Sequence, residues 1–308
     1  MTGFSIALHG GAGVIRKDAL DPARAAATHA ALRDALEAGA AVLRADGSAL
    51  DAVSAAVMAL EECALFNAGH GAVFNRDGRH EMDAAVMDGR TRAAGAVAGI
   101  CGPRNPVLAA RAVMEHTPHV LMIGTGAEAV ARAAGLEFVD PARFHTEERW
   151  QALQATLAMQ AQGAEDDDPA RRHGTVGAVA RDRAGTLAAA TSTGGMTAKT
   201  PGRVGDTPVI GAGTWACDHC AVSATGHGEV FIRFAAAHEI AARMRHAGQS
   251  IAEAAQRVVM QDLARNDGSG GLVAVDRKGR VVMPFNCAGM YRAAIEHEGL
   301  PTTAIHDD

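Results

Sequence analysis

The sequence predicts an α+β fold in which antiparallel sheets stack on one another and helices cover them from outside. Capped, Ala-rich helical patterns fill the N-terminal half, whereas short apolar strands at hairpin spacing dominate the C-terminal half. Several of these strands are apolar on both faces, so both faces must be covered. The 308 residues, 48% of them hydrophobic, suffice for one large layered domain or for two domains.

In the N-terminal half, a short apolar strand over 4–8 leads into the turn HGGAG, and helices follow it. Capping residues mark the helix starts. The predicted helices run from Asp21–Pro22 to about 46, from Ser48 to about 62, from Asn105–Pro106 to 117 and from Thr146 to about 159. The stretch 120–135 is predicted as strand, glycine turn and helix. The stretch 63–88 is predicted as loop, short strand and turn. The helical pattern ends in AQGAEDDDPARRH (161–173), which predicts an exposed, mobile loop.

Beyond this loop the pattern changes to strands. They are predicted over 176–180, 187–193, 209–216, 221–224 and 229–234. Two helices, over 235–246 and 250–264, come next. The chain then closes with a hairpin in which 271–276 and 281–286 flank RKGR. Hairpin-spaced strands between groups of helices indicate stacked antiparallel sheets with helices outside.

Composition and charge exclude several classes of protein. The chain has 29 Lys and Arg against 35 Asp and Glu, a net charge of −6, whereas nucleic-acid binding usually needs a strongly basic face. No apolar run approaches the ~20 residues of a membrane span. The N-terminus shows no signal-peptide pattern, and five scattered cysteines fit a reducing cytoplasm. We therefore expect a cytoplasmic protein with no nucleic-acid or membrane partner. The 35 glycines cluster beside Thr, Asn and His, which favours an enzyme over a scaffold.

Two motifs offer weak alternatives. GTGAEA (124–129) approximates a dinucleotide-binding fingerprint, but the supporting acid should follow by about 20 residues, and Asp140 lies 16 residues after Gly124. CDHC (217–220) has the spacing of a metal site, yet no second ligand pair completes it. We regard an ordinary turn and a pair of idle thiols as the better explanations.

A stronger pattern combines three glycine-rich segments that contain threonine with a fourth that carries Arg203 and Asp206. They are HGTVGAVA (173–180), TSTGGMT (191–197), PGRVGD (201–206) and ATGHGE (224–229). An internal Thr hydroxyl is a poor nucleophile, but cleavage before it frees an α-amine whose reference pKa is about 7.7–8.0 and which can act as its base. Glycine N–H groups can stabilise an oxyanion, and an Arg/Asp pair can recognise an α-amino acid. Each motif alone has a structural explanation, but four in sequence favour chemistry.

These segments resemble the plant-type L-asparaginases and isoaspartyl peptidases, a family of N-terminal-nucleophile hydrolases. The similarity extends over nearly the whole chain. Besides the threonine segments, the motifs that carry it are HGGAG, LEECALFNAGHGAVF, MDAAVMDG, NDGSGGLVAVD and MPFNCAGMYR. The resemblance implies a four-layer αββα sandwich, formed by residues 1–308 as a single domain. It also implies self-cleavage between Gly174 and Thr175 into an α-subunit, 1–174, and a β-subunit, 175–308.

The resemblance also implies the roles of individual residues. Thr175 matches the nucleophile, Thr193 the threonine that hydrogen-bonds to it, and Thr225 with the Gly226 N–H the oxyanion hole. Arg203 matches the residue that binds the substrate α-carboxylate, and Asp206 and the Gly228 carbonyl match the partners of the α-ammonium. Backbone carbonyls of the loop from 60 to 70 match the ligands of a structural Na⁺. The implied sodium ligands are Leu60, Glu61, Cys63, Phe66, Ala68 and His70.

The implied reaction is hydrolysis of the side-chain amide of L-Asn or of a β-aspartyl (isoaspartyl) dipeptide, with no cofactor for catalysis. The implied assembly is a dimer of αβ units. His227, within the glycine-rich turn, leaves substrate preference open. The related glycosylasparaginases fit less well because they are usually lysosomal or secreted. The rival hypotheses are a nucleotide-dependent oxidoreductase using GTGAEA and an amino-acid-binding module that performs no chemistry.

Overall fold

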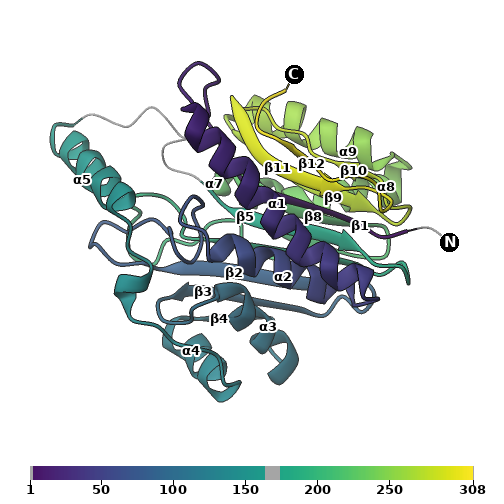
Figure 1. Cartoon of the computed structure of the whole chain (residues 1–308), viewed down its shortest axis with the longest axis horizontal. Coiled ribbons are helices and arrows are strands. Elements are labelled where there is room, and N and C mark those ends of the chain that lie inside the picture. Colours follow the sequence, from purple (N-terminus) through teal and green to yellow (C-terminus); the bar gives the residue numbers. More distant parts are fainter. Residues whose placement is uncertain (1–2, 164–173, 308) are drawn as a thin grey trace.

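The computed structural model describes residues 3–163 and 174–307, and its helices and strands form a mixed α and β architecture around two sheets (Figure 1). The predicted α+β class is confirmed. The predicted loop 161–173 lies outside the described residues except for 161–163, of which Ala161 ends a helix. Among the described residues, no helix is both long enough and apolar enough to cross a membrane.

The larger sheet has eight strands in the order β12-β11-β1-β5-β6-β2-β3-β4. All neighbouring pairs are antiparallel except β3 and β4. In chain order these strands are β1 (Ser5–Gly13), β2 (Met82–Asp88), β3 (Ala94–Ile100), β4 (Leu121–Ile123), β5 (Val176–Arg181), β6 (Leu187–Thr193), β11 (Gly289–Ile295) and β12 (Thr302–Ala304).

The smaller sheet contains four antiparallel strands in the order β10-β9-β8-β7. They are β7 (Thr214–Ala216), β8 (Cys220–Gly226), β9 (Gly270–Asp276) and β10 (Val281–Val282). One apolar cluster joins the two sheets: it contains Ala7 and Val179 from the larger sheet and Val273 and Val275 from the smaller one. The sheets therefore pack face to face.

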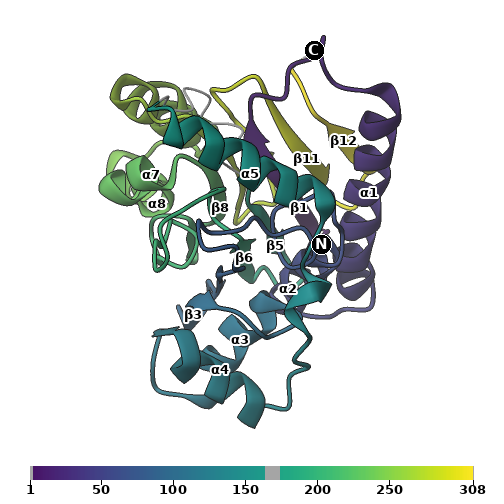
Figure 2. The same ribbon diagram turned by 90° about the vertical axis from the view of Figure 1, so that its left-hand side faces the viewer.

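Helices cover the outer faces of both sheets. On the larger sheet, α1 (Pro22–Arg44) and α2 (Ala49–Glu61) share a core with β1, β5, β6 and β11, while α3 (Pro106–His116) and α4 (Gly124–Ala133) pack on β2 and β3. On the smaller sheet, α7 (Gly228–Phe234), α8 (Ala236–Ala247), α9 (Ile251–Arg257) and a π-helical turn (Val258–Leu263) pack on β8 and β9. In Figure 2 the α3–α4 pair lies at the bottom of the molecule, and α7 and α8 lie at the upper left. A short 3₁₀ turn (Pro141–Arg143) precedes α5 (Glu147–Ala161).

Side-chain alternation along β1 and β5 explains why these strands are apolar on both faces. Ile6 and Leu8 of β1 face the helices, whereas Ala7 between them faces the smaller sheet. In β5, Val176 and Ala178 face the helices and Val179 faces the smaller sheet. Successive side chains of a strand point to opposite faces, so a sheet buried on both sides needs apolar residues at every position.

Several predicted elements were wrong. HGGAG is no turn, because β1 continues through it with a bulge between His9 and Gly11 and pairs with β11 and β5. The strand predicted over 229–234 is helix α7. Its neighbours Val230 and Phe231 pack into the same cluster, whereas a strand would point them to opposite faces.

Two more predicted strands are shorter in the structure. Of 209–216, only Thr214–Ala216 is a strand, because turns fold the preceding residues back on Asp206. Of 281–286, only Val281–Val282 is a strand, since Pro284 has no N–H for a ladder. The strands β3, β11 and β12 were not predicted.

Candidate active site

The predicted threonines meet at one end of the stacked sheets. Thr175 directly precedes β5 and Thr193 ends β6, and the pairing of Val176 with Ser192 places the two threonines beside each other. Thr225 lies near the end of β8, and its hydroxyl accepts a hydrogen bond of 3.2 Å from the Ala12 N–H of β1. Three strands from distant parts of the sequence therefore converge on one small region.

Thr193 connects the Thr175 hydroxyl to the peptide bond before it. The Thr175 hydroxyl donates to Thr193 Oγ1 at 3.2 Å, and the Thr193 hydroxyl donates to the Gly174 carbonyl oxygen at 3.0 Å. The Gly195 N–H donates to Thr193 Oγ1 at 3.0 Å. A threonine hydroxyl has one proton and two lone pairs, so these three bonds use its full capacity. Thr193 thus both orients the hydroxyl of Thr175 and polarises the Gly174 carbonyl.

Asn67 is a functional residue that sequence reasoning missed. Its Nδ2 donates to the Gly174 carbonyl oxygen at 2.7 Å and to the Gly195 carbonyl oxygen at 2.8 Å, while its Oδ1 accepts from the Val73 N–H at 2.9 Å. Asn67 is buried. Its position in the motif FNAGHG was the available signal. The Gly174 carbonyl oxygen therefore has two donors, Asn67 and Thr193, at the bond predicted to be cleaved.

His9 fixes the backbone of Thr175 from the other side. Burial lowers the pKa of His9 to about 3, so its ring is neutral near pH 7. Its Nδ1 lies 2.9 Å from the Thr175 carbonyl oxygen, which only accepts, so Nδ1 carries the proton and Nε2 accepts from the Ser223 hydroxyl at 2.9 Å. Thr191 continues this buried chain at 2.8 Å from Ser223.

The absence of a side chain at Gly177 leaves space for the hydrogen-bonded side chains of His9 and Ser223. A Cβ there would lie 1.9 Å from Ser223 Oγ and 2.7 Å from His9 Nε2, so any side chain would displace both. The glycine two residues after Thr175 therefore belongs to the site.

Gly226 also occupies a position that only glycine fits. Its φ is +149°, and a Cβ would lie 2.3 Å from the Ser269 carbonyl oxygen, where β8 meets β9. Thr225 and Gly226 are the last two residues of β8, and their role as an oxyanion hole stays a prediction.

The structure gathers the predicted substrate-binding residues around Gly228, the first residue of α7. A Cβ on Gly228 would lie 2.9 Å from Asp206 Oδ1 and 3.1 Å from Arg203 Nη2. Read alone, PGRVGD could be explained as a surface pair of Arg203 and Asp206, but that explanation is wrong because Asp206 is buried. Instead Arg203 forms a two-pronged ion pair with Glu229, with both N–O distances 3.0 Å.

One carboxylate oxygen of Asp206 is available to bind a cationic ligand. Burial raises the pKa of Asp206 to about 7, and its Oδ2 has no hydrogen-bond partner among the described residues. A buried polar atom without a partner is costly, so such atoms usually mark a ligand or water. An ammonium group in contact with Oδ2 would both supply the hydrogen bond and favour the charged carboxylate.

The loop from 60 to 70 has the donor chemistry of a hard-cation site. It folds tightly through Gly69 and Gly71, both with positive φ. A Cβ at Gly69 would lie 2.4 Å from the Glu61 carbonyl oxygen, and one at Gly71 would lie 2.6 Å from that of Phe66. Carbonyl oxygens crowd into this loop and keep lone pairs for a cation even where they accept a backbone N–H. Their chemistry is compatible with a hard cation, and the sodium site itself stays a prediction.

Neither alternative motif gains support. The strand before GTGAEA is the three-residue edge strand β4, and the Asp140 carboxylate caps a 3₁₀ turn by accepting from the Ala142 N–H at 2.8 Å. Cys217 and Cys220 are buried and face each other across the β7–β8 hairpin. Within residues 3–163 and 174–307, no group of three or more His, Cys, Asp or Glu side chains is arranged to hold a metal.

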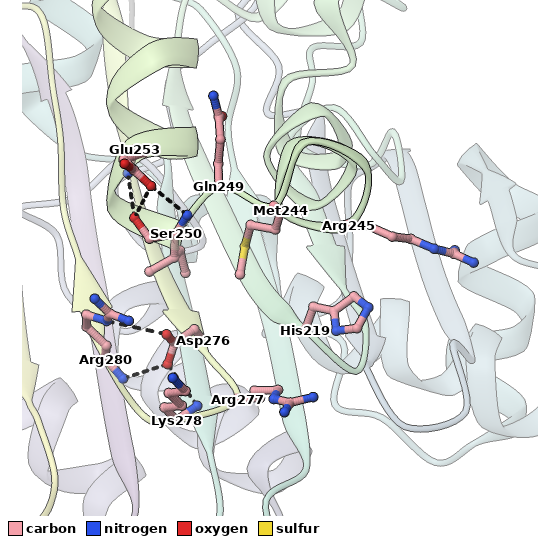
Figure 3. Close-up of a pocket in the computed structure, with 12 residues that line it drawn as sticks. His219, Met244, Arg245, Gln249, Ser250, Glu253, Asp276, Arg277, Lys278 and Arg280 are labelled. Atoms are coloured by element: carbon pink, nitrogen blue, oxygen red, sulfur yellow. Dashed lines mark hydrogen bonds and ion pairs between the residues drawn. The ribbon is translucent and has the colours of Figure 1, made fainter.

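A basic cavity of about 580 Å³ lies elsewhere, between the α8–α9 connection and the β9–β10 hairpin (Figure 3). Within it, Asp276 is bonded to Arg280, and Ser250 to Glu253. None of the predicted site residues lines this cavity, so its size does not make it the catalytic centre.

Comparison with known proteins agrees with the geometry. A family model described as asparaginase matches residues 2–305. The chain is 53% identical to an isoaspartyl peptidase of Salmonella typhimurium, with 98% of each chain covered. It is 54% identical to an isoaspartyl peptidase of Escherichia coli, covering 98% of this chain and 95% of that one. A plant-type L-asparaginase of Thermococcus kodakarensis is 43% identical, covering 93% of this chain and 94% of the relative.

Proposed function

The chain belongs to the asparaginase family and is a hydrolase, and from that premise we propose that Thr175 cleaves the side-chain amide of L-Asn and of β-aspartyl dipeptides to give L-aspartate. Two relatives named isoaspartyl peptidase, both above 50% identity, support β-aspartyl dipeptides as the preferred substrates. The observation that carries the proposal is the hydrogen-bonded group of Thr175, Thr193, Asn67 and the Gly174 carbonyl.

Maturation begins with this group. The Thr175 hydroxyl oxygen attacks the Gly174 carbonyl carbon, the C–N bond breaks, and the hydroxyl proton ends on the released α-amine. Asn67 Nδ2 and the Thr193 hydroxyl already donate to the carbonyl oxygen on which negative charge develops. Water then hydrolyses the ester, leaving a carboxylate on Gly174 and a free amine on Thr175. The products are chains 1–174 and 175–308.

The same threonine then acts on substrate. Its α-amine takes the hydroxyl proton while the oxygen attacks the side-chain carbonyl carbon, and it returns the proton to the leaving amine. Thr193 orients the hydroxyl, and Thr225 with the Gly226 N–H receives the oxyanion. Water releases aspartate from the ester. Because Thr175 supplies both nucleophile and base, we propose that catalysis needs no cofactor.

The substrate is held by its α-amino-acid group. Arg203 binds the α-carboxylate, while Asp206 and the Gly228 carbonyl bind the α-ammonium. The partnerless Oδ2 of Asp206 supports this assignment. Because Glu229 occupies the guanidinium of Arg203 in this structure, the substrate carboxylate must share or displace that contact.

We further propose that the stacked sheets and their helices form the four-layer αββα sandwich of the N-terminal-nucleophile hydrolases, assembled as a dimer of αβ units in the cytoplasm. The apolar cluster between the sheets and the helical cover of both outer faces support the sandwich. A Na⁺ held by the carbonyls of the loop from 60 to 70 would brace the segment that carries Asn67.

Mass spectrometry of purified protein tests the function directly. Wild type should convert from one 31.6 kDa species into two fragments, and N-terminal sequencing of the second should give Thr-Val-Gly-Ala. Thr175→Ala should stay intact and inactive, whereas Thr200→Ala, at an exposed threonine, should behave as wild type. An intact chain that hydrolyses L-Asn would refute the mechanism. A protein that binds aspartate but never consumes L-Asn or a β-aspartyl dipeptide would be a binding module instead.

A further inference from the structure

A small polar cavity borders the bond that is predicted to be cleaved. Its volume is about 130 Å³, room for about four water molecules. The cavity opens between the glycine-rich end of β1 and the first turn of α5, and none of the predicted site residues lines it. Its lining includes Gly11, Arg24, Asn67, Arg149, Gly174 and Tyr291.

Arg149 is a cation without an anion in this cavity. Its Nε donates to the Gly71 carbonyl oxygen at 2.9 Å, but no carboxylate in the described ranges, 3–163 and 174–307, forms an ion pair with it. Burial is the main cause that lowers the pKa of its guanidinium. The neighbouring Arg24 differs, because both of its terminal nitrogens bind Glu148, at 3.0 and 2.8 Å. Arg149 is partly buried and has the charge of Glu148 nearby, but no described carboxylate pairs with its guanidinium, which is therefore able to receive an anion.

The chemistry of the reaction places the leaving group on this side of Thr175. The leaving amine must take its proton from the Thr175 nitrogen and must therefore lie within hydrogen-bond distance of it. Gly11 lines the cavity, and a Cβ on Gly11 would lie 3.4 Å from the Thr175 nitrogen and 3.2 Å from the Gly174 Cα. The cavity thus adjoins the nitrogen that protonates the leaving amine. Arg203 and Asp206, which hold the aspartyl part, do not line it.

We propose that this cavity is the subsite for the leaving amino acid of a β-aspartyl dipeptide and that Arg149 binds the free α-carboxylate of that residue. The inference rests on the proposed function and extends it to substrate selection. L-Asn releases only ammonia and places no carboxylate near Arg149. The volume favours small leaving residues such as glycine, alanine and serine, with longer side chains directed out of the cavity.

The test compares three substrates on fully matured protein: β-aspartyl-alanine, its C-terminal amide, and L-Asn. In wild type, the free dipeptide should exceed its amide in kcat/KM by about tenfold, the typical value of a charge-assisted hydrogen bond. Arg149→Gln should remove most of that advantage, mainly through KM, and should lower the ratio of kcat/KM for the dipeptide to that for L-Asn by about tenfold. Arg149→Lys, which keeps the charge, should restore part of the selectivity. Arg245→Gln, at an exposed arginine of α8, is the matched control.

The possible results distinguish the proposed subsite at Arg149 from the proposed hydrolase activity. Equal losses on all three substrates, or an unchanged ratio of dipeptide to amide, would overturn the subsite while leaving the hydrolase intact. A slower appearance of the two fragments, with unchanged selectivity once they have formed, would show that Arg149 binds the new carboxylate of Gly174 instead and would also overturn it. A wild type that matures but hydrolyses none of the substrates would overturn both proposals.

Discussion

Replacing Asn67 by Asp should block self-cleavage almost completely. The substitution keeps the size of the side chain and keeps Oδ1 as the acceptor for the Val73 N–H, but it removes the NH₂ group that donates to the Gly174 and Gly195 carbonyl oxygens. Losing one of the two donors to the carbonyl should raise the barrier by about 2.7–4 kcal/mol, a slowing of about 10²–10³-fold. The two lost hydrogen bonds should also lower the free energy of unfolding by about 1–3 kcal/mol.

The assay follows the 31.6 kDa chain by denaturing gel or mass spectrometry while it matures, with thermal denaturation as a check of folding. Asn75→Asp is the matched control. Asn75 is also buried, its Oδ1 accepts from the Asp77 and Arg79 N–H groups, and its Nδ2 has no partner among the described residues. A folded Asn67→Asp protein that matures at the wild-type rate would refute the assignment of Asn67 as a donor to the reacting carbonyl.

Three further predictions follow from the same region. The pKa of Asp206 is raised from 3.8 to about 7, so the folded state binds this proton more tightly than the unfolded state does. The free energy of unfolding should therefore fall as the pH rises from 4 to 7. Asp206→Asn should accordingly raise the melting temperature of the ligand-free protein at pH 8 but not at pH 4. Gly226→Ala should lower the free energy of unfolding in urea by more than about 3 kcal/mol, because the new Cβ would clash with the Ser269 carbonyl oxygen. Gly202→Ala, where φ is +82° and the space is open, should lower it by only about 1–2 kcal/mol. Similar losses in the two variants would contradict the clash at Gly226. Exchange of Na⁺ for choline at constant ionic strength should lower the melting temperature by a few degrees if the loop from 60 to 70 binds the ion, and an unchanged value would exclude that role.

Local signals in the sequence predicted the helices well. The side chains of Asp21, Ser48 and Thr146 each accept a backbone N–H at the start of the predicted helix. A capping interaction involves residues within three positions of each other, so a single stretch of sequence contains all of it. The helix predicted from Asn105 also forms, although Asn105 makes no side-chain cap.

The strands were harder because their partners are far away in the sequence. The bulged β1 is extended through HGGAG only because β5 and β11 flank it, and no residue near HGGAG reveals them. The segment over 229–234 offered apolar residues suited to either structure, and the shared burial of Val230 and Phe231 decided for a helix. Tertiary context overrides local propensity in both cases.

The same reasoning applies to the site. Thr175 and Thr193 were proposed from glycine-rich threonine segments and from the family resemblance, and the structure brings their hydroxyls within hydrogen-bond distance, whereas their catalytic roles stay predictions. Asn67 and His9 were missed because their contacts with Gly174 and Thr175 span 107 and 166 residues, respectively. Neither residue type indicates by itself that it positions a backbone carbonyl.

The strand order of the larger sheet has a consequence for the matured protein. The proposed cut would leave β1 in chain 1–174, between β11 and β5, which would both belong to chain 175–308. The fragments are thus interleaved, and separating them requires breaking the ladders on both sides of β1. The uncut chain refolds by first-order kinetics, whereas two separate fragments must first associate, so their refolding after removal of denaturant depends on protein concentration. Diluted mature enzyme should therefore regain activity far more slowly than uncut Thr175→Ala protein regains its structure.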